Sequence, residues 1–242
     1  MVFFAAEGIT KQFGGLLACH KVDLQINEGE IVGLIGPNGA GKSTFFALVA
    51  GFYKPDAGKV FFLGEEITGM APEEICRRGI ARTFQIVRPF GSMTVLENIL
   101  VGAFFRDKNK KRAAAWAEEV LAFTGLAARR DVLAGELTIA DKKRLELARA
   151  LATRPKLLLL DEVMAGLNPK ETQEAVELVQ AINQRGVTLF VVEHVMEVIM
   201  PISHRVMVLD GGNKIAEGPP EEVAKNPEVI KAYLGEKYYA AG

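Results

Sequence analysis

The stretch EIVGLIGPNGAGKSTFFALVAG, residues 30–51, decides the fold of this chain. Its first part, residues 31–35, is apolar and predicts a strand that is buried on both faces of a parallel sheet. Residues 36–44 fit the pattern GxxxxGK[ST], and a helix is expected to follow over residues 43–49. Strand, glycine-rich turn and helix in this order favour a phosphate-binding loop over a turn that binds no ligand.

Each residue type in this loop suits the binding of phosphate. The glycines let successive backbone N–H groups face inward, and the helix N-terminus adds a partial positive charge. The Lys42 ammonium can reach the β- and γ-phosphates, while the Ser43 hydroxyl can ligate Mg²⁺. The residues expected to contact a nucleotide here are Gly36, Pro37, Asn38, Gly39, Ala40, Gly41, Lys42, Ser43 and Thr44.

Two acidic residues follow a second buried strand, which is predicted at residues 157–160. Burying the Asp161 and Glu162 carboxylates at the end of an apolar strand costs free energy unless a cation or another partner compensates their charge. Beside a phosphate loop, the first carboxylate commonly holds Mg²⁺ and the second can orient or deprotonate the attacking water. The alternative is a strand that simply exits into solvent.

Two further strands are predicted at residues 187–192 and 79–84, and His194 and Gln85 follow them. A lone histidine is more often structural, and a lone glutamine would carry no functional weight. In open α/β sheets, however, ligands bind beyond the carboxyl ends of the strands. We therefore expect the phosphate loop, Gln85, the two carboxylates and His194 to converge at one sheet edge.

Composition narrows the class of protein. The 242 residues suit one α/β domain, with or without a smaller inserted lobe. The 29 basic and 30 acidic side chains nearly cancel, which argues against nucleic acid as a partner. Cys19 and Cys76 suggest neither a zinc site nor a disulfide framework. No apolar run approaches the roughly 20 residues that a membrane-spanning helix needs.

With these motifs in this order, the chain resembles the ABC (ATP-binding cassette) ATPase family over essentially its whole length. GPNGAGKST looks like the Walker A motif, LLLLDE like Walker B, Gln85 like the Q-loop and His194 like the switch histidine. The resemblance implies ATP and Mg²⁺ as cofactors, with Glu162, His194 and Lys42 as catalytic residues. It implies Ser43, Gln85 and Asp161 near the metal, and Phe13 under the adenine; the alternative for Phe13 is an ordinary core aromatic.

The resemblance also implies the architecture. We expect a single ABC ATPase domain over residues 1–242, of the α/β class, with a P-loop NTPase (RecA-like) core at about 1–85 and 153–219. The core should carry an N-terminal antiparallel β portion. A helical lobe is expected at about 86–152, with helices at residues 94–105 and 112–123, and a closing C-terminal helix at about 220–239.

A closer resemblance is to the ATP-binding proteins of branched-chain amino acid importers, carried by ITKQFGGLLA, LDEVMAGLNP and GPPEEVAKNPEVIKAYLG. It implies a peripheral subunit at the cytoplasmic face of the inner or plasma membrane. The implied partners are a second ABC ATPase subunit, multi-span permease subunits and, indirectly, a solute-binding protein. The alternatives are a soluble ABC ATPase without a transport role, and a regulatory nucleotide-binding subunit with weak hydrolysis.

One motif departs from the family pattern. The signature segment, usually LSGGQ, reads Leu137-Thr138-Ile139-Ala140-Asp141 and has lost both glycines. In the family this loop contacts the nucleotide held by the opposite subunit, and Thr138 keeps a hydroxyl for that contact in trans. Ile139 cannot adopt positive φ cheaply, and Asp141 adds negative charge where a phosphate should sit. We expect a competent Walker site, whereas the site that this chain completes in trans should be weaker or differently tuned.

Overall fold

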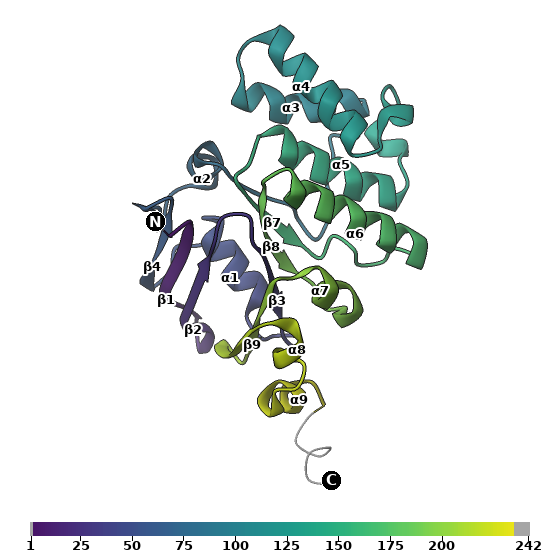
Figure 1. The fold of residues 1–242 in the computed structure, drawn as a ribbon. Helices are drawn as coiled ribbons and strands as arrows, with labels where there is room; N and C mark the ends of the chain where they lie inside the picture. The colour runs from purple at the N-terminus through teal and green to yellow at the C-terminus, as the bar shows by residue number, and fades with distance from the viewer. Residues whose placement is uncertain (1, 235–242) are drawn as a thin grey trace. The chain divides into compact units, whose positions relative to one another are not determined.

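The computed structural model describes residues 2–234, which fold as two compact units. The first unit combines Met1–Ile75 with Thr188–Gly242, and the second is Cys76–Val187. All helices of the expected lobe belong to the second unit, which also contains two strands and a further helix (Figure 1). In the part of the chain described, no helix is long and apolar enough to cross a membrane.

An antiparallel sheet in the first unit confirms the expected N-terminal β portion. Its strands follow the order β2-β1-β4-β5, and β1 is central because it pairs with both β2 and β4. Phe4 lies opposite Ile26 on one side and Phe62 on the other, and all three side chains are buried. The strands are β1 (Phe4–Phe13), β2 (Leu16–Ile26), β4 (Ala57–Phe62) and β5 (Glu65–Glu66).

The first unit also contains four strands of a mixed sheet, in the order β10-β9-β3-β8. β3 runs parallel to both β8 and β9, and β10 closes the edge in the antiparallel sense. Phe45 and Phe46 of α1 pack against Phe190 of β8, which fixes that helix on the sheet. The elements are β3 (Ile31–Ile35), α1 (Lys42–Val49), β8 (Thr188–Val192), α7 (Met196–Ile202), β9 (Arg205–Asp210) and β10 (Asn213–Gly218).

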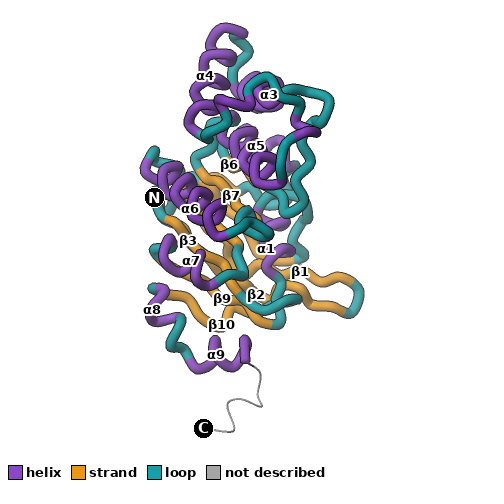
Figure 2. Tube along the Cα trace, turned by 90° about the vertical axis from the view of Figure 1, so that its right-hand side faces the viewer, coloured by secondary structure: helices purple, strands orange, loops and turns teal. Residues whose placement is uncertain are grey.

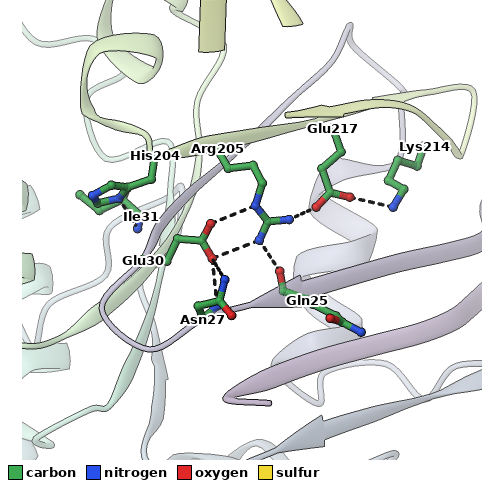
Figure 3. Close-up of polar contacts among 8 residues, drawn as sticks. All are labelled: Gln25, Asn27, Glu30, Ile31, His204, Arg205, Lys214 and Glu217. Atoms are coloured by element: carbon green, nitrogen blue, oxygen red, sulfur yellow. Dashed lines mark hydrogen bonds and ion pairs between the residues drawn. The ribbon is translucent and has the colours of Figure 1, made fainter. Parts of the chain in front are cut away.

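A polar network ties together the amino ends of β3 and β9 (Figure 3). The Arg205 guanidinium donates to both oxygens of Glu30, at 2.9 and 3.1 Å, and it also bonds Glu217 of β10. A further bond reaches the Gln25 carbonyl oxygen at the end of β2. Burial raises the pKa of Glu30, but its bonds to Arg205 prevail and hold the pKa below the usual value. Arg205 therefore joins the two sheets of the first unit.

The second unit consists of a parallel strand pair and packed helices. The strand expected at residues 79–84 is shorter and covers only Ile80–Arg82. The backbone turns away from the sheet after it, because the Phe84 N–H donates to the Glu146 carboxylate and not to a neighbouring strand. Helices α3, α4 and α5 pack against one another (Figure 1). The elements are β6 (Ile80–Arg82), α3 (Val95–Arg106), α4 (Lys110–Phe123), the 3₁₀ turns Ala127–Arg129 and Ala134–Glu136, α5 (Ile139–Ala152), β7 (Leu157–Asp161) and α6 (Pro169–Gln184); α2 (Pro72–Arg78) crosses the boundary between the units.

The carboxyl end of the chain differs from the expected single helix over residues 220–239. It forms two short helices, α8 (Pro220–Val223) and α9 (Pro227–Leu234), with a turn between them (Figure 2). Pro227 explains the interruption, since proline has no N–H to continue a helix and disfavours a helical residue before it. The last part of the expected helix lies outside the described residues.

Candidate functional site

The phosphate loop forms as the sequence predicts, between the buried strand β3 and helix α1. The side chain of Lys42 folds back into the loop, where its ammonium donates to the carbonyl oxygens of Gly36 (2.6 Å) and Pro37 (2.9 Å). Lys42 is only 8% exposed, whereas Asn38, Gly39 and Ser43 face solvent. The loop thus encloses a fixed positive charge and leaves an open side where an anion can bind.

Two glycines of the loop are required by close contacts. Gly36 and Gly41 adopt φ of +150° and +101°. A Cβ atom would lie 2.1 Å from the Leu209 carbonyl oxygen at Gly36, and 2.2 Å from the Ala18 carbonyl oxygen at Gly41. Any side chain at either position would therefore push β9 or β2 away from the loop.

Residues that the sequence did not single out support the loop from behind. The Gly212 N–H donates to the Ala40 carbonyl oxygen (3.1 Å), and its own carbonyl accepts from the His20 N–H (2.8 Å). The Tyr233 hydroxyl of α9 accepts the Gly36 N–H, and burial raises the pKa of this tyrosine. Burial also raises the pKa of the Cys19 thiol, which lies 3.8 Å from the Gly41 carbonyl oxygen, to about 12. No sequence pattern links these distant positions.

His194 comes to the same sheet edge as the phosphate loop. In the parallel pairing of β3 with β8, Leu34 lies opposite Val192, so the register places His194 level with Gly36. The histidine is exposed just beyond a strand whose five residues are all buried. Within the first unit, the structure therefore brings together two of the predicted site elements.

Phe13 forms an aromatic pair that sequence reasoning missed. Its ring centroid lies 5.2 Å from that of Tyr53 in an edge-to-face arrangement, and the two rings are 40% and 46% exposed. Lys11 lies over the Phe13 ring and pairs with Asp56, which lowers the pKa of that carboxyl. Phe13 is consequently not the ordinary core aromatic that we considered.

In the second unit, β6 and β7 run parallel with Arg82 opposite Leu159. Asp161, the last residue of β7, is buried, and its carboxylate forms an ion pair with Arg82 at 2.7 Å. Its backbone N–H donates to the Thr83 hydroxyl at 3.1 Å. The expected metal ligand therefore already has a cationic partner, which balances its charge in the buried strand end.

Glu162 and Gln85, both predicted site residues, are in direct contact. The Gln85 side-chain amide donates to the Glu162 carboxylate at 2.6 Å. Glu162 has φ of +49°, a left-handed conformation that is uncommon for a residue with a side chain. Such strained backbone positions concentrate at functional sites.

The signature segment forms the capped start of a helix, which the sequence analysis did not predict. α5 begins at Ile139, which is therefore helical and needs no positive φ. Thr138 is the N-cap residue, and its hydroxyl accepts the Asp141 N–H at 3.1 Å. The Asp141 carboxylate lies 3.6 Å from the Arg129 guanidinium, which offsets part of its negative charge. A side chain of the same polypeptide thus accepts a hydrogen bond from one of the first backbone N–H groups of this helix.

A metal ion held by protein side chains alone has no site among the described residues, since no cluster of three or more His, Cys, Asp or Glu occurs there. Mg²⁺ does not require one. It usually keeps several waters and binds through one or two protein oxygens together with substrate phosphates. The Ser43 hydroxyl, the Asp161 carboxylate and the Gln85 amide oxygen fit this hard-oxygen chemistry.

Two family models match the chain. The model for ABC transporters matches residues 19–165, and the model for branched-chain amino acid ATP-binding cassette transporters matches residues 213–239. The high-affinity branched-chain amino acid transport ATP-binding protein LivG of Salmonella typhimurium is 43% identical, with 96% of this chain and 97% of that protein covered. The corresponding protein BraF of Pseudomonas aeruginosa is also 43% identical, over 95% and 96%.

Solved structures agree with the sequence matches. A nucleotide-free ATP-binding cassette from an ABC transporter superposes with a TM-score of 0.88 at 33% identity, covering 98% of this chain and all of that one. A dimeric cassette bound to ADP and inorganic phosphate superposes with a TM-score of 0.81 at 26% identity, over 90% and 98%. Motifs, fold and relatives agree: the chain belongs to the ABC transporter family and is one of its ATPase cassettes.

Proposed function

We propose that this cassette drives an importer of branched-chain amino acids. The observation that carries the proposal is its 43% identity, over nearly the whole of both chains, to ATP-binding proteins of high-affinity branched-chain amino acid transport. The C-terminal match of residues 213–239 to a model for such cassettes supports the same assignment independently of the phosphate loop. The near-neutral charge disfavours the rival role in nucleic-acid repair or translation.

The residues of the phosphate loop would bind the nucleotide. The Lys42 ammonium, already held inside the loop, would neutralise the β- and γ-phosphates, and the first N–H groups of α1 would bind phosphate oxygens. Mg²⁺, when bound, would neutralise charge on the transferred phosphoryl group, with Ser43, Asp161 and Gln85 as its protein ligands. Phe13, with one edge supported by Tyr53, offers a ring on which adenine can stack.

Glu162 would accept the proton of the attacking water. Gln85 holds its carboxylate at 2.6 Å, so the amide can orient the base before the reaction begins. His194 would stabilise the negative charge that develops on the γ-phosphoryl group. Asp161 takes no part in proton transfer, because its carboxylate forms an ion pair with Arg82.

Two cassettes would act together, as in the dimeric relative bound to ADP and phosphate. The implied partners are a second ABC ATPase subunit and permease subunits that span the membrane, with a solute-binding protein acting through the permease. The cassette would then be peripheral, at the cytoplasmic face of the membrane. The self-capped start of α5 supports a partner ATPase of different sequence, because a cap within the chain would leave the site completed in trans weaker.

Uptake in the native host tests this assignment. In cells whose only copy carries Glu162→Gln, entry of labelled leucine, isoleucine and valine should fall to background, while lysine uptake stays unchanged as the control. The variant should still bind ATP, because the base does not hold the phosphates. Unchanged leucine uptake would overturn the transport assignment, and loss of ATP binding would make Glu162 structural.

The partners can be identified directly. The tagged chain, purified from detergent-solubilised membranes, should carry permease subunits and a second, related ATPase that mass spectrometry identifies. If the chain is recovered only from the soluble fraction, alone or with nucleic acid or ribosomes, the assignment as an ATPase would still hold, but the assignment to an importer would be overturned.

A further inference from the structure

The turn that follows β7 holds Glu162 in an unusual backbone conformation. With φ of +49°, Glu162 occupies the left-handed region, which is unfavourable for a residue with a Cβ atom. The Ala165 N–H closes the turn by donating to the Glu162 carbonyl oxygen at 3.3 Å, a long bond. Such a turn persists only when neighbouring groups fix it.

A lysine from α5 supplies that fixation. The Lys143 ammonium donates to the carbonyl oxygen of Glu162 at 3.0 Å and to that of Ala165 at 2.6 Å. It therefore contacts both ends of the turn, and the charged donor makes these bonds stronger than bonds between neutral groups. In the sequence, Lys143 is the middle residue of the basic run Lys142-Lys143-Arg144 near the start of α5.

A small pocket lies between α5 and the segment after β7. It is lined by Ala140, Lys143 and Leu147 from the helix and by Val163 and Leu167 from the segment after β7. The two ammonium bonds of Lys143 therefore connect α5 to the turn beside this pocket.

We propose that Lys143 is a positioning residue for Glu162, which it keeps in the conformation that lets the carboxylate meet Gln85. This inference rests on the proposed function, in which Glu162 is the base. If the turn relaxes out of the left-handed region, the Cα–Cβ bond of Glu162 changes direction. The carboxylate then leaves the position where Gln85 holds it at 2.6 Å, and displacements of about 1 Å commonly cost about a hundredfold in rate.

Steady-state kinetics of the full-length chain, purified with the partners that stay bound, tests the inference. Lys143→Met should lower kcat about tenfold to a hundredfold and leave KM for ATP within about twofold, because the phosphate loop is untouched. Lys143→Arg, which keeps a charged donor, should retain at least about a third of kcat. Lys142→Met is the matched control: this lysine precedes Lys143 on α5, and its ammonium donates to the Gly135 carbonyl oxygen at 3.0 Å in a different segment. It should leave kcat within about twofold.

Hydrogen exchange gives a readout independent of activity. Amides at residues 162–167 should exchange at least about fivefold faster in Lys143→Met than in the Lys142→Met control. Wild-type kcat in Lys143→Met, equal losses in Lys143→Met and Lys143→Arg, or unchanged exchange would each overturn the inference. Glu162→Gln separates this failure from failure of the proposed function: if it abolishes turnover while Lys143→Met does not, only the role of Lys143 is wrong.

Discussion

Helices α1 and α5 both begin after a loop that the ABC resemblance assigns to nucleotide binding, yet their N-termini differ. α1 has Gly41 as its N-cap residue, with no side-chain cap and no acidic residue in its first turn. α5 starts with Thr138 as a bonded cap and Asp141 in its first turn, beside Arg129. The first N–H groups of a helix need an acceptor. At α1 that acceptor can come from outside the chain, whereas α5 supplies its own.

The largest expected effect is at α1. Gly41→Ala should weaken ATP binding about a hundredfold, because a methyl group would lie 2.2 Å from the Ala18 carbonyl oxygen and φ is +101°. Titration calorimetry with ATP measures the change in Kd. Gly218→Ala is the control, since its methyl would meet only ordinary contacts of 3.7 Å or more. Wild-type affinity in Gly41→Ala would mean that the loop does not need its present shape.

A smaller effect is expected from opening the start of α5. Ile139→Gly combined with Ala140→Gly should raise turnover of the assembled transporter about threefold, a change of less than 1 kcal/mol in the barrier. The glycines destabilise the helix and free its first turn to approach a phosphate in trans. Turnover must be measured well below the melting temperature of the variant. Unchanged turnover would show that the altered signature segment is not impaired.

The cap of α5 should matter for stability more than for turnover. Thr138→Ala should lower the free energy of unfolding by about 1 kcal/mol, because the Asp141 N–H loses its side-chain acceptor. Thr138→Ser keeps a hydroxyl and should cost much less. Urea denaturation measures both changes, and an equal cost for the two variants would rule out capping as the reason.

A pH-dependent effect concerns Glu146, further along α5. Burial raises the pKa of its carboxyl above the ordinary 4.5, so the folded state binds the proton more tightly than the unfolded chain does. Its contribution to stability is fully present below pH 4.5 and is lost as the pH rises through the raised value. Glu146→Gln cannot ionise and should gain up to about 1 kcal/mol relative to wild type at pH 8 but not at pH 4. Thermal melts across this range measure the difference, and an equal difference at both pH values would contradict it.

The sequence predicted best where one local pattern determines the structure. The apolar runs before Gly36, Asp161 and His194 all form buried strands, and the glycine pattern gives the phosphate loop. The strand before Gln85 was predicted too long, because its end depends on a bond from Phe84 to Glu146, which no local pattern records.

Other features were missed because they join distant positions. Tyr53 reaches Phe13, and Gly212 reaches Ala40, only through the fold. Lys143 gave no signal, because a lysine that bonds two carbonyl groups has the same local sequence as one in solvent. The predicted convergence of Asp161 and Glu162 with the phosphate loop and His194 stays a prediction, since these residues belong to different units.

The contact of Tyr233 with Gly36 has a consequence for the newly synthesised chain. The phosphate loop is translated early, but the hydroxyl that accepts its first N–H, and the β9 strand against which it packs, emerge near the end. A polypeptide still on the ribosome therefore has a phosphate loop that lacks both of these packing partners.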